Sequence, residues 1–164
     1  MHVREATSED VPRIREVARE SWQAAYAAFL TPRQCRRALD DLYPPEALER
    51  AIEALDGFHL LVAERGGEVV AFASAEQTWA DEAELYALYV HPDHWGEGVG
   101  SALLDAVEAR VADEVDRLAC SVFVENYAGV GFFESQGFER LGEARTEVAG
   151  SVHEEYEMEK RLEG

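Results

Sequence analysis

AELYALYVHPDHWGEGVGSALL, residues 83–104, is the stretch that decides the fold. Its first eight residues predict a strand, and the apolar spacing after the glycines predicts a helix that begins near Gly98. The loop between them carries glycine at three alternate positions, Gly96, Gly98 and Gly100. The first backbone N–H groups of a helix lack partners, and glycine lets a ligand approach them, so the loop suits a phosphate or pyrophosphate. A tight structural turn is the alternative explanation of the same glycines.

Two familiar phosphate loops do not match this segment. A P-loop places lysine and then serine or threonine after its last glycine, whereas Gly100 is followed by Ser101 and Ala102. The dinucleotide fingerprint stands near the start of a strand–helix–strand unit, whereas this segment follows four expected strands. A nucleotide phosphate-binding protein is therefore the weakest of the functions considered.

The composition indicates one folded domain over residues 1–164. The chain is 47% hydrophobic, has no uninterrupted apolar run long enough to span a membrane, and begins without a basic-then-apolar leader. We therefore expect a cytoplasmic protein with no membrane partner. The two cysteines, Cys35 and Cys120, lie far apart and outside any CxxC pattern, so we expect reduced thiols and no cysteine metal site.

The charge is strongly acidic. Thirty-four acidic residues against fifteen basic ones give a formal net charge of −19, and Lys160 is the one lysine. Nucleic-acid binding depends on basic clusters, so nucleic acid is not an expected partner. The acid excess resembles that of halophile proteins, whose surface charges are screened because the Debye length is roughly 3 Å at about 1 M salt. An ordinary acidic surface is the alternative.

The rest of the chain predicts a mixed sheet. Thr7 and Ser8, with Asp10, are typical of a helix start, and Gly66-Gly67 of a hairpin turn. Three strands in a row followed by a strand–helix–strand unit favour an α/β (α+β) fold with helices on both sheet faces. The expected strands are 2–7, 58–65, 68–78, 83–90, 117–124 and a pair around Gly150-Ser151; the expected helices are 11–30, 44–56, one from about 98, and 125–136.

A second stretch makes a family resemblance specific. VFVENYAGVGFFESQGFE, residues 122–139, follows the glycine loop in the order seen in GNAT N-acetyltransferases. The chain resembles that family over nearly its whole length. The resemblance implies the GNAT fold, a mostly antiparallel sheet of about seven strands, and acyl transfer from acetyl-CoA.

The resemblance also implies a donor site. The pyrophosphate of acetyl-CoA would lie on the loop, the pantetheine arm would pair with the end of the strand, and the thioester would enter a gap between two splayed strands. The implied acetyl-CoA-binding residues are Leu88, Tyr89, Val90, Gly96, Glu97, Gly98, Val99, Gly100, Ser101, Asn126 and Phe133.

Two residues depart from the family pattern. Trp95 stands where the family has arginine or glutamine, and few basic residues surround the loop, so CoA meets a poorly cationic site. Phe133 stands where the family often has a tyrosine that protonates the leaving thiolate. Water or a phenol of Tyr86, Tyr89 or Tyr127 would replace it, or the thiolate leaves unaided.

The acceptor side rests on fewer residues. Glu84 heads the strand that points at the thioester and is the expected general base; one more exposed acid is the alternative. Trp22 and Tyr26, four residues apart on a helix, and Tyr86 are the expected substrate wall, with an ordinary core role as the alternative. Phe58, Phe72 and Phe123 are expected in the core.

Other constellations favour structural roles. His91 and His94 belong to a turn that starts with proline, so we expect no metal. Cys120 is expected to be a small core residue rather than a nucleophile. The predicted function is direct acetyl transfer from acetyl-CoA to a primary amine, on a small molecule or a peptide, in a ternary complex. A non-catalytic acyl-CoA-binding module is the rival, and a homodimer is compatible with the resemblance.

Overall fold

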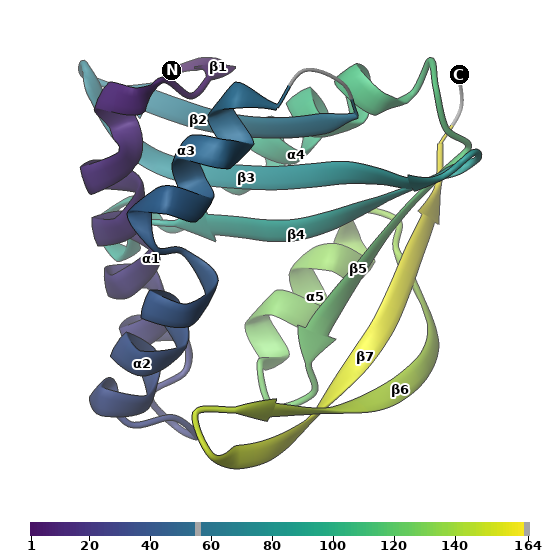
Figure 1. The fold of residues 1–164 in the computed structure, drawn as a ribbon. Coiled ribbons are helices and arrows are strands. Elements are labelled where there is room, and N and C mark those ends of the chain that lie inside the picture. The colour runs from purple at the N-terminus through teal and green to yellow at the C-terminus, as the bar shows by residue number, and fades with distance from the viewer. Residues whose placement is uncertain (55–56, 163–164) are drawn as a thin grey trace.

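The computed structural model describes residues 1–54 and 57–162 and contains a seven-stranded sheet with helices on both faces (Figure 1). The elements in chain order are β1 (His2–Glu5), η1 (Ser8–Asp10), α1 (Val11–Ala25), α2 (Pro32–Leu42), α3 (Pro45–Glu53), β2 (Phe58–Arg65), β3 (Glu68–Trp79), β4 (Glu82–Val90), η2 (Pro92–His94), α4 (Val99–Val111), β5 (Arg117–Phe123), α5 (Tyr127–Ser135), β6 (Glu139–Val148) and β7 (Ser151–Arg161).

The sheet is mixed, as the sequence predicted. Its strand order is β1-β2-β3-β4-β5-β7-β6, and the described pairs are antiparallel except β4 with β5. Parallel neighbours need a crossover, and α4 supplies it between β4 and β5. The glycine loop therefore lies at the end of β4, where the chain turns into α4.

Two hydrophobic cores lie on opposite faces of the sheet. One packs α4 and α5 through residues such as Leu103, Leu104 and Val130. The other packs α1, α2 and α3 through residues such as Ile14 and Leu48. Since helices cover both faces, a gap between two strands of this sheet is bordered by side chains from both cores.

The helical region before β2 differs from the prediction. α1 ends at Ala25, not near residue 30, and the amides of Phe29 and Leu30 both donate to the carbonyl of Tyr26 in a turn. A helix that the sequence analysis did not predict, α2, then begins at Pro32. The sequence carried its signal, because Thr31 accepts from the amide of Gln34 at 3.1 Å and proline is favoured in the first turn.

Several local predictions are confirmed. Gly66 and Gly67 form the β2–β3 turn at φ 62° and 81°, and the Thr7 amide donates to Asp10 Oδ2 at 2.8 Å. The helix expected over 44–56 is α3 as far as Glu53, and residues 55 and 56 lie outside the described part. None of the described helices has the length and apolarity needed to cross a membrane.

Candidate active site

A β-bulge opens the middle of the sheet. Ser74 of β3 pairs with Ala87 while Ala75 pairs with Leu85, so Tyr86 of β4 has no opposite residue. The parallel pairing of β4 with β5 ends at the same point, with Leu85 opposite Cys120. A bulge bends its strand and increases the local twist. Beyond it, β4 and β5 diverge (Figure 1), as the sequence analysis expected.

The divergence exposes one backbone edge of β4. The His91 amide donates to the Val70 carbonyl at 2.8 Å, so His91 faces β3. Because successive residues of a strand direct their backbone groups to opposite sides, Val90 and Leu88 direct theirs into the gap. This edge can pair with an extended ligand as an added strand would. The indole of Trp95 donates to the Val90 carbonyl at 2.7 Å and already occupies one of its acceptor positions.

The glycine loop has the conformation that an anion site needs. Gly96 and Gly98 take φ of 78° and 80°, in the left-handed region that favours glycine. A Cβ built on either residue would meet nothing within 4 Å, so the space beside them is open. Gly98 caps α4 without a side chain, which leaves the amides at the start of that helix directed toward this space.

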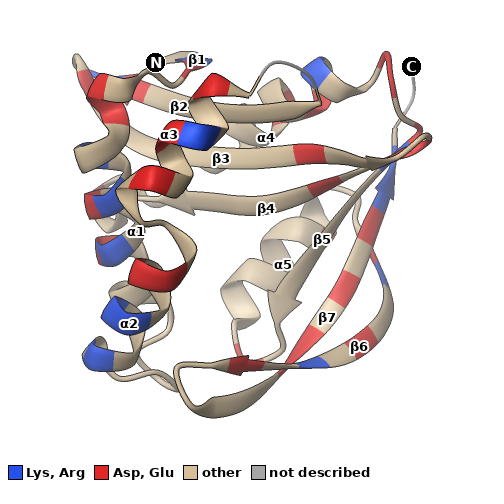
Figure 2. Cartoon of the chain, in the orientation of Figure 1, with Lys and Arg blue, Asp and Glu red and all other residues tan. Residues whose placement is uncertain are grey.

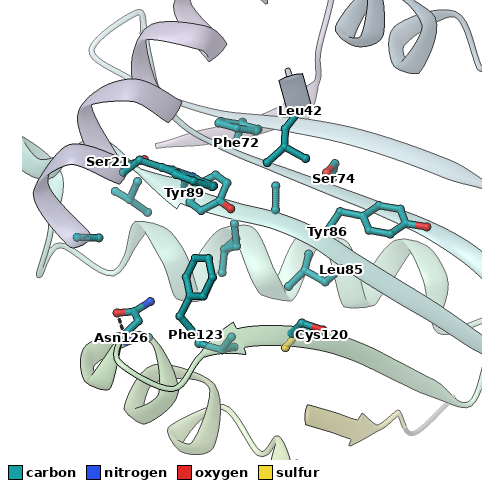
Figure 3. A pocket seen from close by; sticks show the side chains of 18 of the residues that line it. Ser21, Leu42, Phe72, Ser74, Leu85, Tyr86, Tyr89, Cys120, Phe123 and Asn126 are labelled. Carbon is teal, nitrogen blue, oxygen red and sulfur yellow. Dashed lines mark hydrogen bonds between the residues drawn. The ribbon is translucent and has the colours of Figure 1, made fainter. Parts of the chain in front are cut away.

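One large cavity joins the loop to the gap. Its volume is about 1350 Å³, and it runs from Gly96–Ser101 past the end of β4 to Glu84, with α1 and α2 along one side (Figure 3). Figure 3 shows Tyr89 on one side of the gap and Phe123 on the other, with Cys120 farther along toward Leu85. The cavity therefore extends from the glycine loop to residues of α1, α2 and α3.

The cavity collects nearly all of the predicted site residues. It is lined by Trp22, Tyr26, Glu84, Tyr86, Leu88, Tyr89, Val90, Gly96, Gly98, Val99, Gly100, Ser101, Asn126 and Phe133. Glu97 is not among the lining residues, because its carboxylate turns to His94 Nδ1 at 2.8 Å and to Arg65 at 3.6 Å. Phe58, Phe72 and Phe123, expected only in the core, line the cavity as well.

The comparisons identify the family. The family model described as the acetyltransferase (GNAT) family matches residues 13–138, which is most of the chain and includes the loop and both diverging strands. The chain belongs to the GNAT acetyltransferase family. It is therefore an acetyl-CoA-dependent acyltransferase, and acetyl-CoA is its co-substrate.

Named relatives agree with this membership. The chain is 25% identical to a spermidine N(1)-acetyltransferase of Thermoplasma acidophilum, over 99% of the chain and 98% of the relative. It is 29% identical to the N-alpha-acetyltransferase RimI of Mycobacterium tuberculosis, over 74% of the chain and 77% of that relative. The fold is similar to a PaiA N-acetyltransferase from T. acidophilum in complex with coenzyme A, with a TM-score of 0.87, 24% identity and 98% coverage of both chains.

The electrostatics of this GNAT enzyme make Glu84 a strong candidate base. Burial raises the pKa of the Glu84 carboxyl, and the charges of Glu82, Glu157 and Glu76 raise it further. A carboxylate with a raised pKa binds a proton more readily and can accept one from an ammonium group more easily. Glu84 lines the cavity beside the point where the strands part.

The candidate proton donors differ sharply in position. Tyr127 is 82% exposed and is absent from the described lining of the cavity. Tyr86 lines the cavity and donates to Glu76 at 2.9 Å; burial, with this hydrogen bond, raises the pKa of Tyr86 to about 12. Burial also raises the pKa of Tyr89. Phe133 packs against Phe132 and Phe138 with ring centroids 5.1 and 5.2 Å away and has no proton to donate.

Cys120 lies at the fork of the two strands. It is 5% exposed, and burial, with the charge of Glu84, raises the pKa of its thiol to about 12. The reactive form of cysteine is the thiolate, so this side chain is a poor nucleophile near neutral pH. The histidines of the loop have structural roles: His91 accepts from the Asp93 amide, and His94 pairs with Glu97. Within the described residues, no three metal-ligating side chains lie together.

The structure adds residues that sequence reasoning missed. Arg65 comes to the glycine loop from the β2–β3 hairpin, and Glu155 reaches the cavity from β7. Leu42, the last residue of α2, and Tyr43, directly after it, also line the cavity, and the sequence analysis did not predict this helix. The Thr31–Gln34 capping pattern signalled α2, but no local signal links Arg65 or Glu155 to the site, because sheet pairing alone brings them there.

Proposed function

We propose that this enzyme transfers the acetyl group directly from acetyl-CoA to a primary amine bound in the same cavity. The observation that carries the proposal is the divergence of β4 and β5 directly beyond Leu85 and Cys120, into a cavity continuous with the open glycine loop. Both substrates can occupy this cavity together, so the amine attacks the thioester without an acyl-enzyme. The raised pKa of the Cys120 thiol supports the same order of events.

The backbone holds the donor. The amides of Gly96–Ser101 would receive the pyrophosphate, and the free edge of β4 at Leu88 and Val90 would pair with the pantetheine arm. The Asn126 side chain faces the cavity (Figure 3), and its Oδ1 accepts from the Gly129 amide at 3.1 Å. Only its Nδ2 group is then available to donate to the arm. Phe133 would border the donor by packing alone.

The reaction then needs a base and a polarised carbonyl. Glu84 accepts the proton of the acceptor ammonium, directly or through water, and the free amine attacks the thioester carbon. The Leu88 amide, directed into the gap, stabilises the negative charge on the carbonyl oxygen. The carbon–sulfur bond breaks, CoA leaves as a thiolate, and the nitrogen loses its extra proton to solvent water as the amide forms. A thiol of pKa about 8.5 needs little help from an acid, so Phe133 is compatible with turnover.

The acceptor is a cationic amine. Figure 2 shows acidic residues on β3, β4 and β7, and a mixture of basic and acidic residues on α1 and α2. Relatives named for spermidine and for N-terminal acetylation both act on amines. We also propose that the enzyme is cytoplasmic, adapted to high salt and homodimeric. Melting curves in molar KCl and light scattering test the last two.

The test is acceptor-dependent release of CoA thiol, followed with dithionitrobenzoate against a panel of amines. We expect release with amines and a loss in kcat of well over tenfold for Glu84→Gln, with the affinity for CoA unchanged. Near-normal kcat in that variant would remove Glu84 from the base role. Binding of CoA without release for any acceptor would favour the rival, a non-catalytic acyl-CoA-binding module, for which Phe133 and Trp95 are the supporting observations.

A further inference from the structure

The Val90 carbonyl lies at the loop end of the open edge of β4. Backbone polar groups away from bulk water are nearly always hydrogen-bonded, because an unpaired group loses the free energy of its contact with water. β5 pairs with β4 only as far as Leu85, so it cannot supply a donor to Val90. Instead, the indole Nε1–H of Trp95 donates to this carbonyl at 2.7 Å. A side chain therefore takes the place of the missing strand.

Little else holds the Trp95 ring in position. Trp95 is 49% exposed and belongs to neither hydrophobic core of the described part of the chain. Its backbone is fixed at the end of η2, where its amide donates to the Pro92 carbonyl at 3.2 Å. Beside it, a Cβ built on Gly96 would meet nothing within 4 Å. The indole can therefore leave Val90 by rotation of its side chain, without movement of the loop.

The acetyl donor needs the same carbonyl. Val90, Trp95 and Gly96 line one cavity. With the pyrophosphate on the glycine loop and the thioester at the fork, the pantetheine arm runs along β4 from Val90 toward Leu85. The arm carries two amide groups, and the outer amide, which is nearer the pyrophosphate, lies at Val90. Its N–H approaches the carbonyl from the open side of the edge, where the indole stands.

We propose that Trp95 sets the affinity for the acetyl donor: its indole occupies the Val90 carbonyl while the donor is absent, and the outer amide of the pantetheine arm displaces it. The inference rests on the proposed function and adds the residue that controls entry of the donor. Binding exchanges one hydrogen bond at Val90 for another, so this contact adds little net affinity. After acetyl transfer, return of the indole to Val90 favours release of CoA.

The first test is the affinity of Trp95→Phe for CoA, measured by calorimetry. Phenylalanine keeps an aromatic ring and removes the indole N–H, so the donor no longer has to break that hydrogen bond. The Kd for CoA should fall about 2- to 12-fold, the range for one hydrogen bond. Trp79→Phe is the matched control, because Trp79 is 70% exposed at the end of β3 and is absent from the described lining of the cavity. Its Kd should stay unchanged.

A truncated donor separates displacement from a general change in the site. S-acetyl-N-acetylcysteamine carries the amide next to the thioester and lacks the outer amide, so it cannot replace the indole at Val90. With one acceptor amine, Trp95→Phe should raise kcat/KM for acetyl-CoA by the same factor as the gain in affinity. The kcat/KM for the truncated donor should stay close to that of the unmodified enzyme.

The indole N–H itself reports the displacement. In the ¹⁵N-labelled enzyme, the Nε1–H signal of Trp95 is the indole signal that is lost in Trp95→Phe. Saturating CoA should shift this signal and speed its exchange with water, since the displaced indole donates to solvent.

The outcomes separate this inference from the proposed function. An unchanged or higher Kd for CoA in Trp95→Phe would overturn the role of Trp95. So would an equal gain with both donors, an equal gain in Trp79→Phe, or an indole signal that CoA leaves unaltered. Absence of CoA binding to the unmodified enzyme would instead contradict the proposed function.

Discussion

The sharpest test of the glycine loop is a pair of glycine-to-alanine variants with the same backbone geometry. Gly98, at the mouth of α4, and Gly67, in the β2–β3 turn, take φ of 80° and 81°, and a Cβ on either would meet nothing within 4 Å. A non-glycine residue in this conformation costs about 1–2 kcal/mol. Gly98→Ala and Gly67→Ala should therefore lose similar stability, roughly 2–8 °C in Tm for a chain of this size.

The effect on CoA should separate the two variants. The Cβ of Gly98→Ala projects into the space that the pyrophosphate would occupy, whereas Gly67 is absent from the described lining of the cavity. Loss of one hydrogen bond to a charged group costs about 1.5–3 kcal/mol, so the Kd for CoA should rise about 10- to 150-fold in Gly98→Ala alone. Differential scanning fluorimetry and isothermal titration calorimetry measure the two effects. Unchanged CoA affinity in Gly98→Ala, or equal weakening in both variants, would refute the loop as the phosphate site.

Four further predictions follow from charge and burial. CoA should bind more tightly as KCl rises from 0.1 to 1 M, because the Debye length falls from about 10 to 3 Å and screens repulsion from the −19 chain; calorimetry showing constant or weaker binding would count against this. Cys120→Ala should keep kcat within a few-fold of the value for the unmodified enzyme, since a thiol of pKa about 12 supplies no thiolate nucleophile. A loss above a hundredfold would indicate a covalent acyl-enzyme instead. Glu84→Gln should raise Tm at pH 8 but not at pH 4. Burial raises the pKa of Glu84 in the folded state, so the charged carboxylate, which forms as the pH rises, destabilises the fold, and glutamine removes that charge. Asp10→Asn should lower the free energy of unfolding by about 1–2 kcal/mol at pH 7 and by little at pH 2. Hydrogen bonding to Arg4 lowers the pKa of Asp10, so the stabilisation by its charged form disappears as the pH falls through that pKa. Equal losses at both pH values would contradict the ion pair.

Local patterns predicted most of the fold. The strand ending at Val90, the glycine loop and the helix from Val99 all follow from short-range periodicity and turn chemistry, and the structure places them as expected. The failures lie between residues 26 and 43. There the predicted helix over 11–30 extends past the true end of α1 at Ala25, and the prediction contains no helix between residues 30 and 44, where α2 lies.

The donor side of the site could be predicted for the same reason. Its proposed groups are backbone amides and carbonyls of one contiguous stretch, so residue order alone brings them together. Glu84 and Asn126 are predicted as site residues because they adjoin that stretch and the corresponding segment after β5, and both line the cavity. Arg65 could not be predicted, since it reaches Glu97 only through the β2–β3 hairpin.

The sequence by itself determined the order of elements, the glycines that permit positive φ, and the acid excess. Only the tertiary structure decided where the sheet opens, because the bulge at Tyr86 exists through the pairing of β4 with β3. It also decided the cavity wall, in which Trp22, Phe123 and Glu155 come from three different elements of the chain. Backbone conformation follows from neighbours along the chain, whereas the meeting of side chains depends on long-range packing that no local pattern encodes.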